Sequence, residues 1–258
     1  MTRALPRTNF HSSTLIRCLA RLEMVGTLEQ ENAFAEKLGL WIHFADAITL
    51  SAVHSDITAP MPMPFMPAAA QINLSTAIAV EFDRTQTGLI NSIIANCSPK
   101  SGKSLIKLPI PLLELPIDIA AAYAPYRWFY DAHQRDMEMR VQPLRTKIRN
   151  ALANVSPRLK KLADLDAALE AILREREGKL LSKIPVLLKI RFEQLFKVHQ
   201  QRLVESREAD NPAAWIHPTG WLTQFCNDMQ MLLLFELELR LQPTVGLIEA
   251  FDTKTNNE

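Results

Sequence analysis

Gly102, Lys103 and Ser104 form the most recognisable candidate for a functional motif, because the phosphate-binding loop of many nucleotide-binding proteins ends in these three residue types. The full pattern also needs a glycine at position 97, where this chain has Cys97. Nothing before the loop reads as the strand that should lead into it, and Pro99 lies inside it. We therefore interpret the segment as a solvated turn and predict no nucleotide cofactor.

Two histidine–aspartate pairs have a spacing that places both side chains on one helix face. They are His43 with Asp46, and His133 with Asp136. A metal site needs at least three converging ligands, and His199 or Asp131 could complete one only if the fold brought them close. We predict no metal site, and we find no nucleophile motif or other catalytic constellation. An enzyme such as a nuclease or hydrolase, with His133 and Asp136 as its residues to test, stays the third hypothesis.

A cluster of basic residues surrounds the Ser-Pro pair at 156–157. Its members are Arg140, Arg145, Lys147, Arg149, Arg158, Lys160 and Lys161. Such a cluster could neutralise phosphates of DNA and bind it without sequence preference. The alternative is that Arg140, Arg145 and Lys147 flank a helix–helix seam and pair with acids such as Asp166 or Glu175 on the next helix.

The segment from Pro218 to Leu241 predicts a helix that is apolar around much of its surface. Such a helix is either buried in a core or docks on a partner protein. In the docking interpretation the contact residues are Trp221, Phe225, Met229 and Leu232.

The composition indicates an all-α fold, because the chain has only 7 glycines in 258 residues and is rich in straight-chain helix formers. In the N-terminal region, 1–120, we expect helices over 12–24, 28–55 and 74–96. A Pro/Met strap lies between them at about 59–68, and an irregular segment follows at about 98–120.

The C-terminal region, 121–258, is predicted to be a helical bundle. Apolar residues with alternating spacings of four and three form a coiled-coil-like seam: Met137, Val141, Leu144, Ile148, Ala151 and Val155. A second helix carries Leu162, Leu165, Leu169 and Ile172 and is expected to end or weaken at Gly178. A third runs over about 182–208. Short joints between these helices predict antiparallel hairpins.

We expect a cytoplasmic chain with no direct membrane insertion. The Arg-rich N-terminus lacks the apolar run of a secretory signal, and the apolar run Met231–Phe235 is far shorter than the ~20 residues that span a bilayer. The three cysteines are widely spaced, which favours reduced, buried thiols.

Four stretches together resemble a proteobacterial family: LGLWIHFADAITLSAV (38–53), HQRDMEMRVQPLRTKIRNAL (133–152), LDAALEAILREREGKLL (165–181) and GWLTQFCNDMQMLLLFELELRLQPTVGLIEAF (220–251). Genes of that family lie beside genes for a MotA/MotB-like motor. The gene set resembles the third type of the Zorya anti-phage defence system, in which the family would be the ZorF component.

The resemblance implies a partner context but no residue roles. Our first hypothesis is a non-enzymatic helical adaptor or effector. It would dock on another protein of the defence system or on the cytoplasmic part of the motor. The alternative, from a different class, is an effector that binds DNA through the basic surface around residues 140–161.

Overall fold

The fold is described by a computed structural model that covers residues 13–22, 43–55, 67–97, 106–111, 118–207 and 209–255. Gly102, Lys103 and Ser104, and all of the predicted strap except its last residues, lie outside these ranges. Within them the secondary structure is helical and contains no strand, which confirms the all-α prediction. The helices are α1 (Thr14–Arg21), α3 (Phe44–Ser55), α4 (Ala68–Asn96), α5 (Ile119–Ala153), α6 (Pro157–Leu181), α7 (Ile184–Ser206), α8 (Pro212–Trp215) and α9 (Trp221–Thr255).

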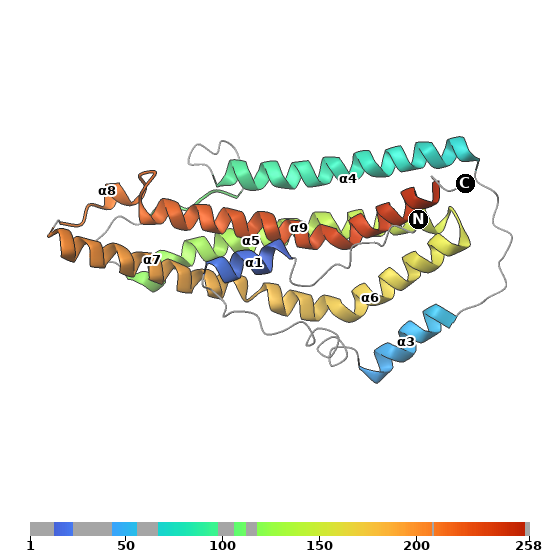
Figure 1. Cartoon of the computed structure of the whole chain (residues 1–258), viewed down its shortest axis with the longest axis horizontal. Helices are drawn as coiled ribbons and strands as arrows, with labels where there is room; N and C mark the ends of the chain where they lie inside the picture. The colour runs from blue at the N-terminus through green and yellow to red at the C-terminus, as the bar shows by residue number, and fades with distance from the viewer. Residues whose placement is uncertain are drawn as a thin grey trace, which may run out of the picture.

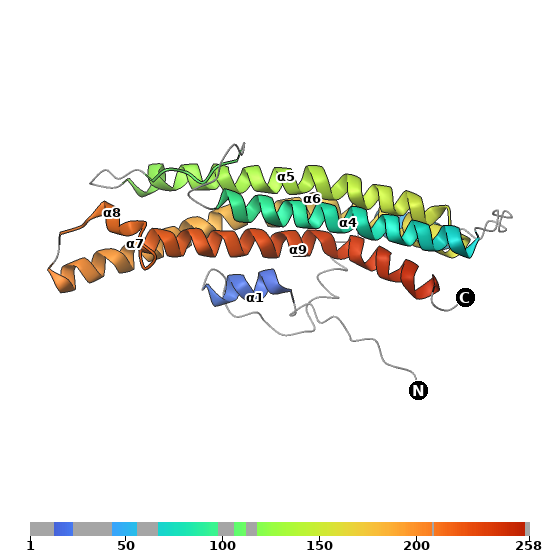
Figure 2. The same cartoon turned by 90° about the horizontal axis from the view of Figure 1, so that it is seen from above.

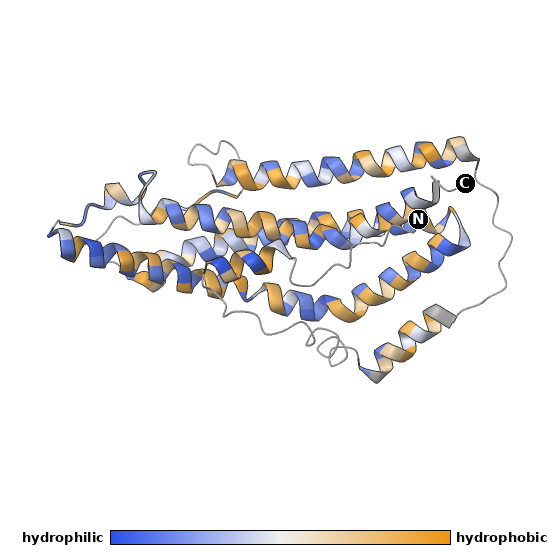
Figure 3. Cartoon of the chain, in the orientation of Figure 1, coloured by the Kyte–Doolittle hydropathy of each residue, from blue (hydrophilic) through white to orange (hydrophobic). Residues whose placement is uncertain are grey.

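Long helices lie side by side in an elongated bundle (Figures 1 and 2). Helix α9 packs against α1, α4, α5, α6, α7 and α8, and α3 packs against α6. Hydrophobic and hydrophilic residues alternate along the helices (Figure 3), so each has an apolar side that faces a neighbour. The core contains residues of α1 and α4 as well as of the C-terminal helices, so the two regions separated in the sequence analysis share one core.

The predicted seam of α5 is buried in the core. Met137, Val141, Leu144, Ile148 and Val155 are all less than a tenth exposed. Ser156 caps the start of α6 by accepting a hydrogen bond from the Leu159 amide at 3.3 Å, and Pro157 occupies the first turn. The break expected at 156–157 is therefore present, and α6 folds back along α5.

The joint between α6 and α7 differs from the expected hairpin. Helix α6 continues through Gly178 to Leu181, so Gly178 does not end it. A joint of two residues then leads into α7, and the two helices follow one another along the bundle (Figure 1). Pro185 lies in the first turn of α7, where its missing amide hydrogen cannot continue the hydrogen bonds of α6. Together α6 and α7 span the length of α5.

Helix α9 is longer than predicted because Pro243 lies inside it and does not end it. Helix α5 likewise contains Pro125 and Pro143. A proline removes one backbone hydrogen bond, but buried turns on both sides of Pro243, with Leu241 and Leu247 nearly inaccessible, keep α9 continuous.

A buried carboxylate connects α5, α6 and α9. Glu236 is fully buried and accepts hydrogen bonds from the Tyr130 hydroxyl at 2.9 Å and the Gln134 amide at 3.0 Å. Arg240 pairs with the same carboxylate at 2.8 Å. The Gln134 amide also donates to the carbonyl of Leu181, the last residue of α6, at 3.1 Å. This Glu236 cluster therefore satisfies a helix-end carbonyl at the α6–α7 joint.

We expect Glu236→Ala to lower the free energy of unfolding by about 3 kcal/mol, because it leaves Arg240 without a counter-charge in a largely buried place. Urea denaturation followed by circular dichroism measures the change. Glu249→Ala, at an exposed position of the same helix, is the control and should change stability by less than about 0.5 kcal/mol. Equal effects of the two substitutions would contradict the role of the cluster.

Candidate docking surface on helix α5

Two of the predicted DNA-binding cations are engaged between helices. Arg145 makes a two-pronged contact with Asp166 at 2.9 and 2.6 Å, and Arg149 pairs with Asp166 at 3.3 Å and with Glu170 at 2.5 Å. The side chains of both arginines are only about an eighth exposed, at 13% and 12%. The flanking-pair alternative is thus confirmed for Arg145 with Asp166, whereas Glu175 pairs with Lys179 instead.

The other five cations differ in their surroundings. Lys147 contacts Glu81 of α4 at 3.1 Å, and Arg140 lies 3.6 Å from Asp136. Arg158, Lys160 and Lys161 are exposed in the first turns of α6, and they make no ion pair with the part of the chain that the structure describes. Of the seven cations, those without an ion pair among the described residues therefore form a short group at the α5–α6 turn.

The four residues predicted to dock are core residues, which corrects that expectation. Trp221 is 6% exposed, and Phe225, Met229 and Leu232 are fully buried. Trp221 and Phe225 pack against the ring of Phe192, with centroid distances of 5.1 and 5.0 Å. Helix α9 is apolar on several sides because it is surrounded by other helices, so these side chains offer no surface to a partner.

The two histidine–aspartate pairs are not brought together with further ligands. Among the described residues, no group of three or more His, Cys, Asp or Glu side chains could hold a metal ion. His43 lies beside Arg176, 2.9 Å from its guanidinium, and Asp46 accepts a hydrogen bond from the His43 amide. His133 is buried beside Phe129, whereas Asp136 faces Arg140.

The cysteines are free thiols, and burial raises the pKa of Cys97 and of Cys226 to about 12. Burial also raises the pKa of Cys18. These thiols stay protonated at neutral pH and are weak nucleophiles.

An outward row of α5 carries two of the most exposed large hydrophobic side chains among the described residues. Trp128 and Met139 are 71% and 69% exposed, and their separation of three helical turns places them on one face. The α5 outer row consists of Trp128, Ala132, Arg135, Met139, Gln142, Thr146 and Asn150, which follow one another at spacings of three or four. Large amphipathic side chains of this kind are common anchors in protein interfaces.

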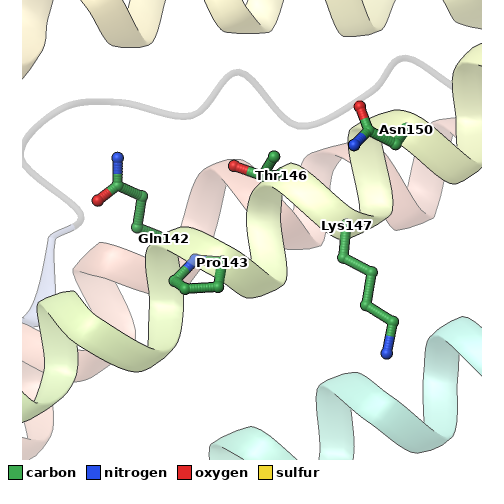
Figure 4. A pocket seen from close by; sticks show the side chains of 5 residues that line it. All are labelled: Gln142, Pro143, Thr146, Lys147 and Asn150. Carbon is green, nitrogen blue, oxygen red and sulfur yellow. The ribbon is translucent and has the colours of Figure 1, made fainter.

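Two shallow grooves accompany this row. The larger, of about 580 Å³, lies between α4 and α5 and is lined by Ser92, Asn96, Ile106, Ala132, Arg135, Asp136, Glu138, Met139 and Arg140. The other, of about 450 Å³, lies beside Pro143 and is lined by Gln142, Pro143, Thr146, Lys147 and Asn150. In Figure 4 the Lys147 side chain extends toward α4, away from Gln142, Thr146 and Asn150. The two grooves border the α5 outer row from Ala132 to Asn150, which is more than half of the helix.

The α4–α5 groove combines apolar and charged walls. Met139 and Ile106 supply apolar surface, and the segment that carries Ile106 is held to the end of α4 by a hydrogen bond from the Leu108 amide to the Asn96 carbonyl at 3.2 Å. Arg135, Asp136 and Glu138 supply charges of both signs. Met139 belongs both to this groove and to the α5 outer row, so the two features share an edge.

The sequence of α5 contains a signal for this surface. The outer row coincides with polar positions of the α5 helix, where Trp128 and Met139 interrupt the polar pattern. The heptad pattern indicates the buried seam, whereas Trp128, on the opposite side of the helix, lies outside that pattern.

Comparison with known proteins identifies a family. The family described as "Protein of unknown function (DUF3348)" matches residues 1–253. No curated protein and no solved structure matches the chain. None of the described helices has the length and apolar character needed to cross a membrane.

The buried His133 gives the fold a pH dependence. Burial lowers the pKa of His133 to about 4 from 6.5, so the unfolded chain binds this proton more tightly than the folded chain. The resulting stability, about 3 kcal/mol, is present above pH 6.5 and is lost as the pH falls toward 4. We expect His133→Phe to flatten the dependence of the unfolding free energy on pH in this window, as measured by urea denaturation.

The control for this substitution is His217→Phe, because His217 is exposed. It should keep the wild-type slope between pH 4 and 6.5. A wild-type slope in His133→Phe would show that other groups cause the loss of stability.

Proposed function

The chain belongs to the DUF3348 family, and we propose that it is a helical docking protein that binds a partner protein through the α5 outer row. The observation that supports this function is the exposure of Trp128 and Met139 on one face of a rigid, core-packed helix beside a groove. The opposite face of α5, with Phe129, Tyr130 and Met137, is buried, so the helix presents the row in a fixed position.

The sequence resemblance supports a context for this docking. The partner would be another protein of a Zorya-like anti-phage defence system, and the first to test is the cytoplasmic part of its MotA/MotB-like motor. We accordingly place the chain in the cytoplasm as a non-enzymatic adaptor or effector. Of the partner chemistries, an amphipathic helix matches the groove best, because Met139 and Ile106 lie among charges of both signs.

We expect Trp128→Ala to weaken partner binding by about thirtyfold, which corresponds to ~2 kcal/mol for a central aromatic anchor. Calorimetric titration with the purified cytoplasmic part of the motor measures the change in Kd. Protein stability should change by less than about 0.5 kcal/mol, because Trp128 is exposed.

The matched control is Ile216→Ala, which removes an exposed apolar side chain at the C-terminal end of α8, outside the α5 outer row. It should leave Kd unchanged. If the wild type binds neither the motor nor another component of the gene set, the docking proposal fails. If it binds and Trp128→Ala has no effect, the surface is wrong.

A second function, DNA binding, is favoured by one observation. Arg158, Lys160 and Lys161 are exposed at the start of α6, where no acid lies in the first turn. A helix N-terminus carries partial positive charge, so three cations there are unfavourable unless an anion is nearby. The phosphates of DNA would supply such anions.

We expect a mobility shift of double-stranded DNA that weakens as salt rises and is lost in the triple variant Arg158→Glu, Lys160→Glu, Lys161→Glu. The control reverses Lys179 and Lys183, which are exposed at the other end of α6. Absence of a shift at low salt, or an unchanged shift in the triple variant, would exclude DNA binding at this turn.

A further inference from the structure

Helix α7 has an outward face that the bundle leaves uncovered among the described residues. Its inner face is buried and contains Leu188, Phe192 and Leu195. The opposite face carries Val186, Ile190, Glu193, Lys197, Gln200 and Val204, all exposed. Val186, Ile190 and Val204 are 54%, 42% and 77% exposed. We name these six residues the α7 outer seam.

The spacing of the outer seam is that of a coiled coil. The six residues follow one another at intervals of 4, 3, 4, 3 and 4. The mean interval equals the helical repeat of about 3.6 residues, so the seam runs straight along the helix without drifting around it. A second helix can therefore lie against it over its whole length.

The charges at the centre of the seam are at most weakly paired within the described part of the bundle. Lys197 makes no ion pair with any residue that the structure describes. Glu193 contacts Lys189 at 3.8 Å, and both side chains are nearly half exposed, at 46% and 44%. A pair of this kind contributes little to stability. Glu193 and Lys197 are thus free to pair across an interface.

The seam is complementary to itself when two copies run antiparallel. With the centre between Glu193 and Lys197, Val186 faces Val204 of the second copy and Ile190 faces Gln200. Glu193 faces Lys197, and the two-fold axis repeats every contact. The apolar pairs lie at the two ends, and two opposite-charge pairs lie at the centre.

A parallel arrangement does not have this property. It would place Glu193 against Glu193 and Lys197 against Lys197, which repel each other. The ion pairs thus select the antiparallel orientation and fix the register, as polar residues do in other helix pairs.

From this self-complementarity we propose that two copies of the chain associate through antiparallel pairing of their α7 outer seams. The occupant of this face is a second copy, because the seam set against its own reversal pairs valine with valine at the two ends and opposite charges at the centre. The pairing is independent of the α5 outer row, which lies on another helix. The polar centre and the single helix pair predict a reversible dimer.

Charge exchange tests the proposal directly. The substitution Glu193→Lys sets two positive charges against each other, because this position faces Lys197 of the second copy. The substitution Lys197→Glu likewise sets two negative charges against each other, because it faces Glu193 of the second copy. We expect each single variant to lower the association constant of the full-length chain at least about tenfold, because the symmetry repeats the repulsion twice. The double variant Glu193→Lys, Lys197→Glu restores two opposite-charge pairs and should recover dimerisation. Sedimentation equilibrium over a wide concentration range measures all four proteins.

The matched control exchanges Glu175 and Lys179, an exposed ion pair of α6 at the same spacing of four residues. Its variants should dimerise like the wild type, and circular dichroism should show an intact fold in every protein. Val204→Glu should also weaken the dimer. A wild type that stays monomeric overturns the proposal, as do single variants without effect or a double variant without recovery.

Discussion

The arrangement of the bundle depends on how it accommodates the interruption between α6 and α7. Two helices that together span the length of α5 leave backbone carbonyls without helical partners at their joint, among them the carbonyl of the buried Leu181. The amide of Gln134 satisfies the carbonyl of Leu181 and is itself held by Glu236. Because the carboxylate also needs Tyr130 and Arg240, the polar cluster fixes the relative positions of α5, α6 and α9.

Periodicity predicted the parts of the fold in which one helix face meets one neighbour. The α5 seam and the capped break at 156–157 followed from spacing and from Ser156. Gly178 was expected to end or weaken α6, and it does not end the helix, because a glycine on an exposed helix surface costs only about 1 kcal/mol, which the packing of α6 outweighs. Pro243 did not end α9 for a similar reason. The direction in which α7 follows α6 depends on the Glu236 cluster. The α5 and α9 members of this cluster lie about a hundred residues apart in sequence, so no local sequence pattern reveals the cluster.

The candidate sites, like the fold, could be predicted from the sequence only in part. The number of basic residues suggested one surface around 140–161. Two of these residues, Arg145 and Arg149, are neutralised by Asp166 and Glu170 of the neighbouring helix. The exposed members that make no ion pair with the described residues lie at the α5–α6 turn, whereas the exposed Lys147 is paired with Glu81. The pairing of Arg145 with Asp166 was predictable from the heptad positions. The second acid for Arg149 was not, because it depends on the rotation of α6 relative to α5.

Burial of α9 decides where recognition can occur. A helix surrounded by neighbours has apolar residues on most of its circumference, and the sequence pattern alone does not distinguish this from a docking helix. Its burial assigns Trp221 and Phe225 to the core, so a partner must contact peripheral helices, which are apolar on one side and solvent-facing on the other. On such helices the informative side chains are those that break the polar outer face, as Trp128 does on α5 and Val204 does on α7. In the proposed docking function, recognition therefore belongs to the outer helices, which α9 holds in place.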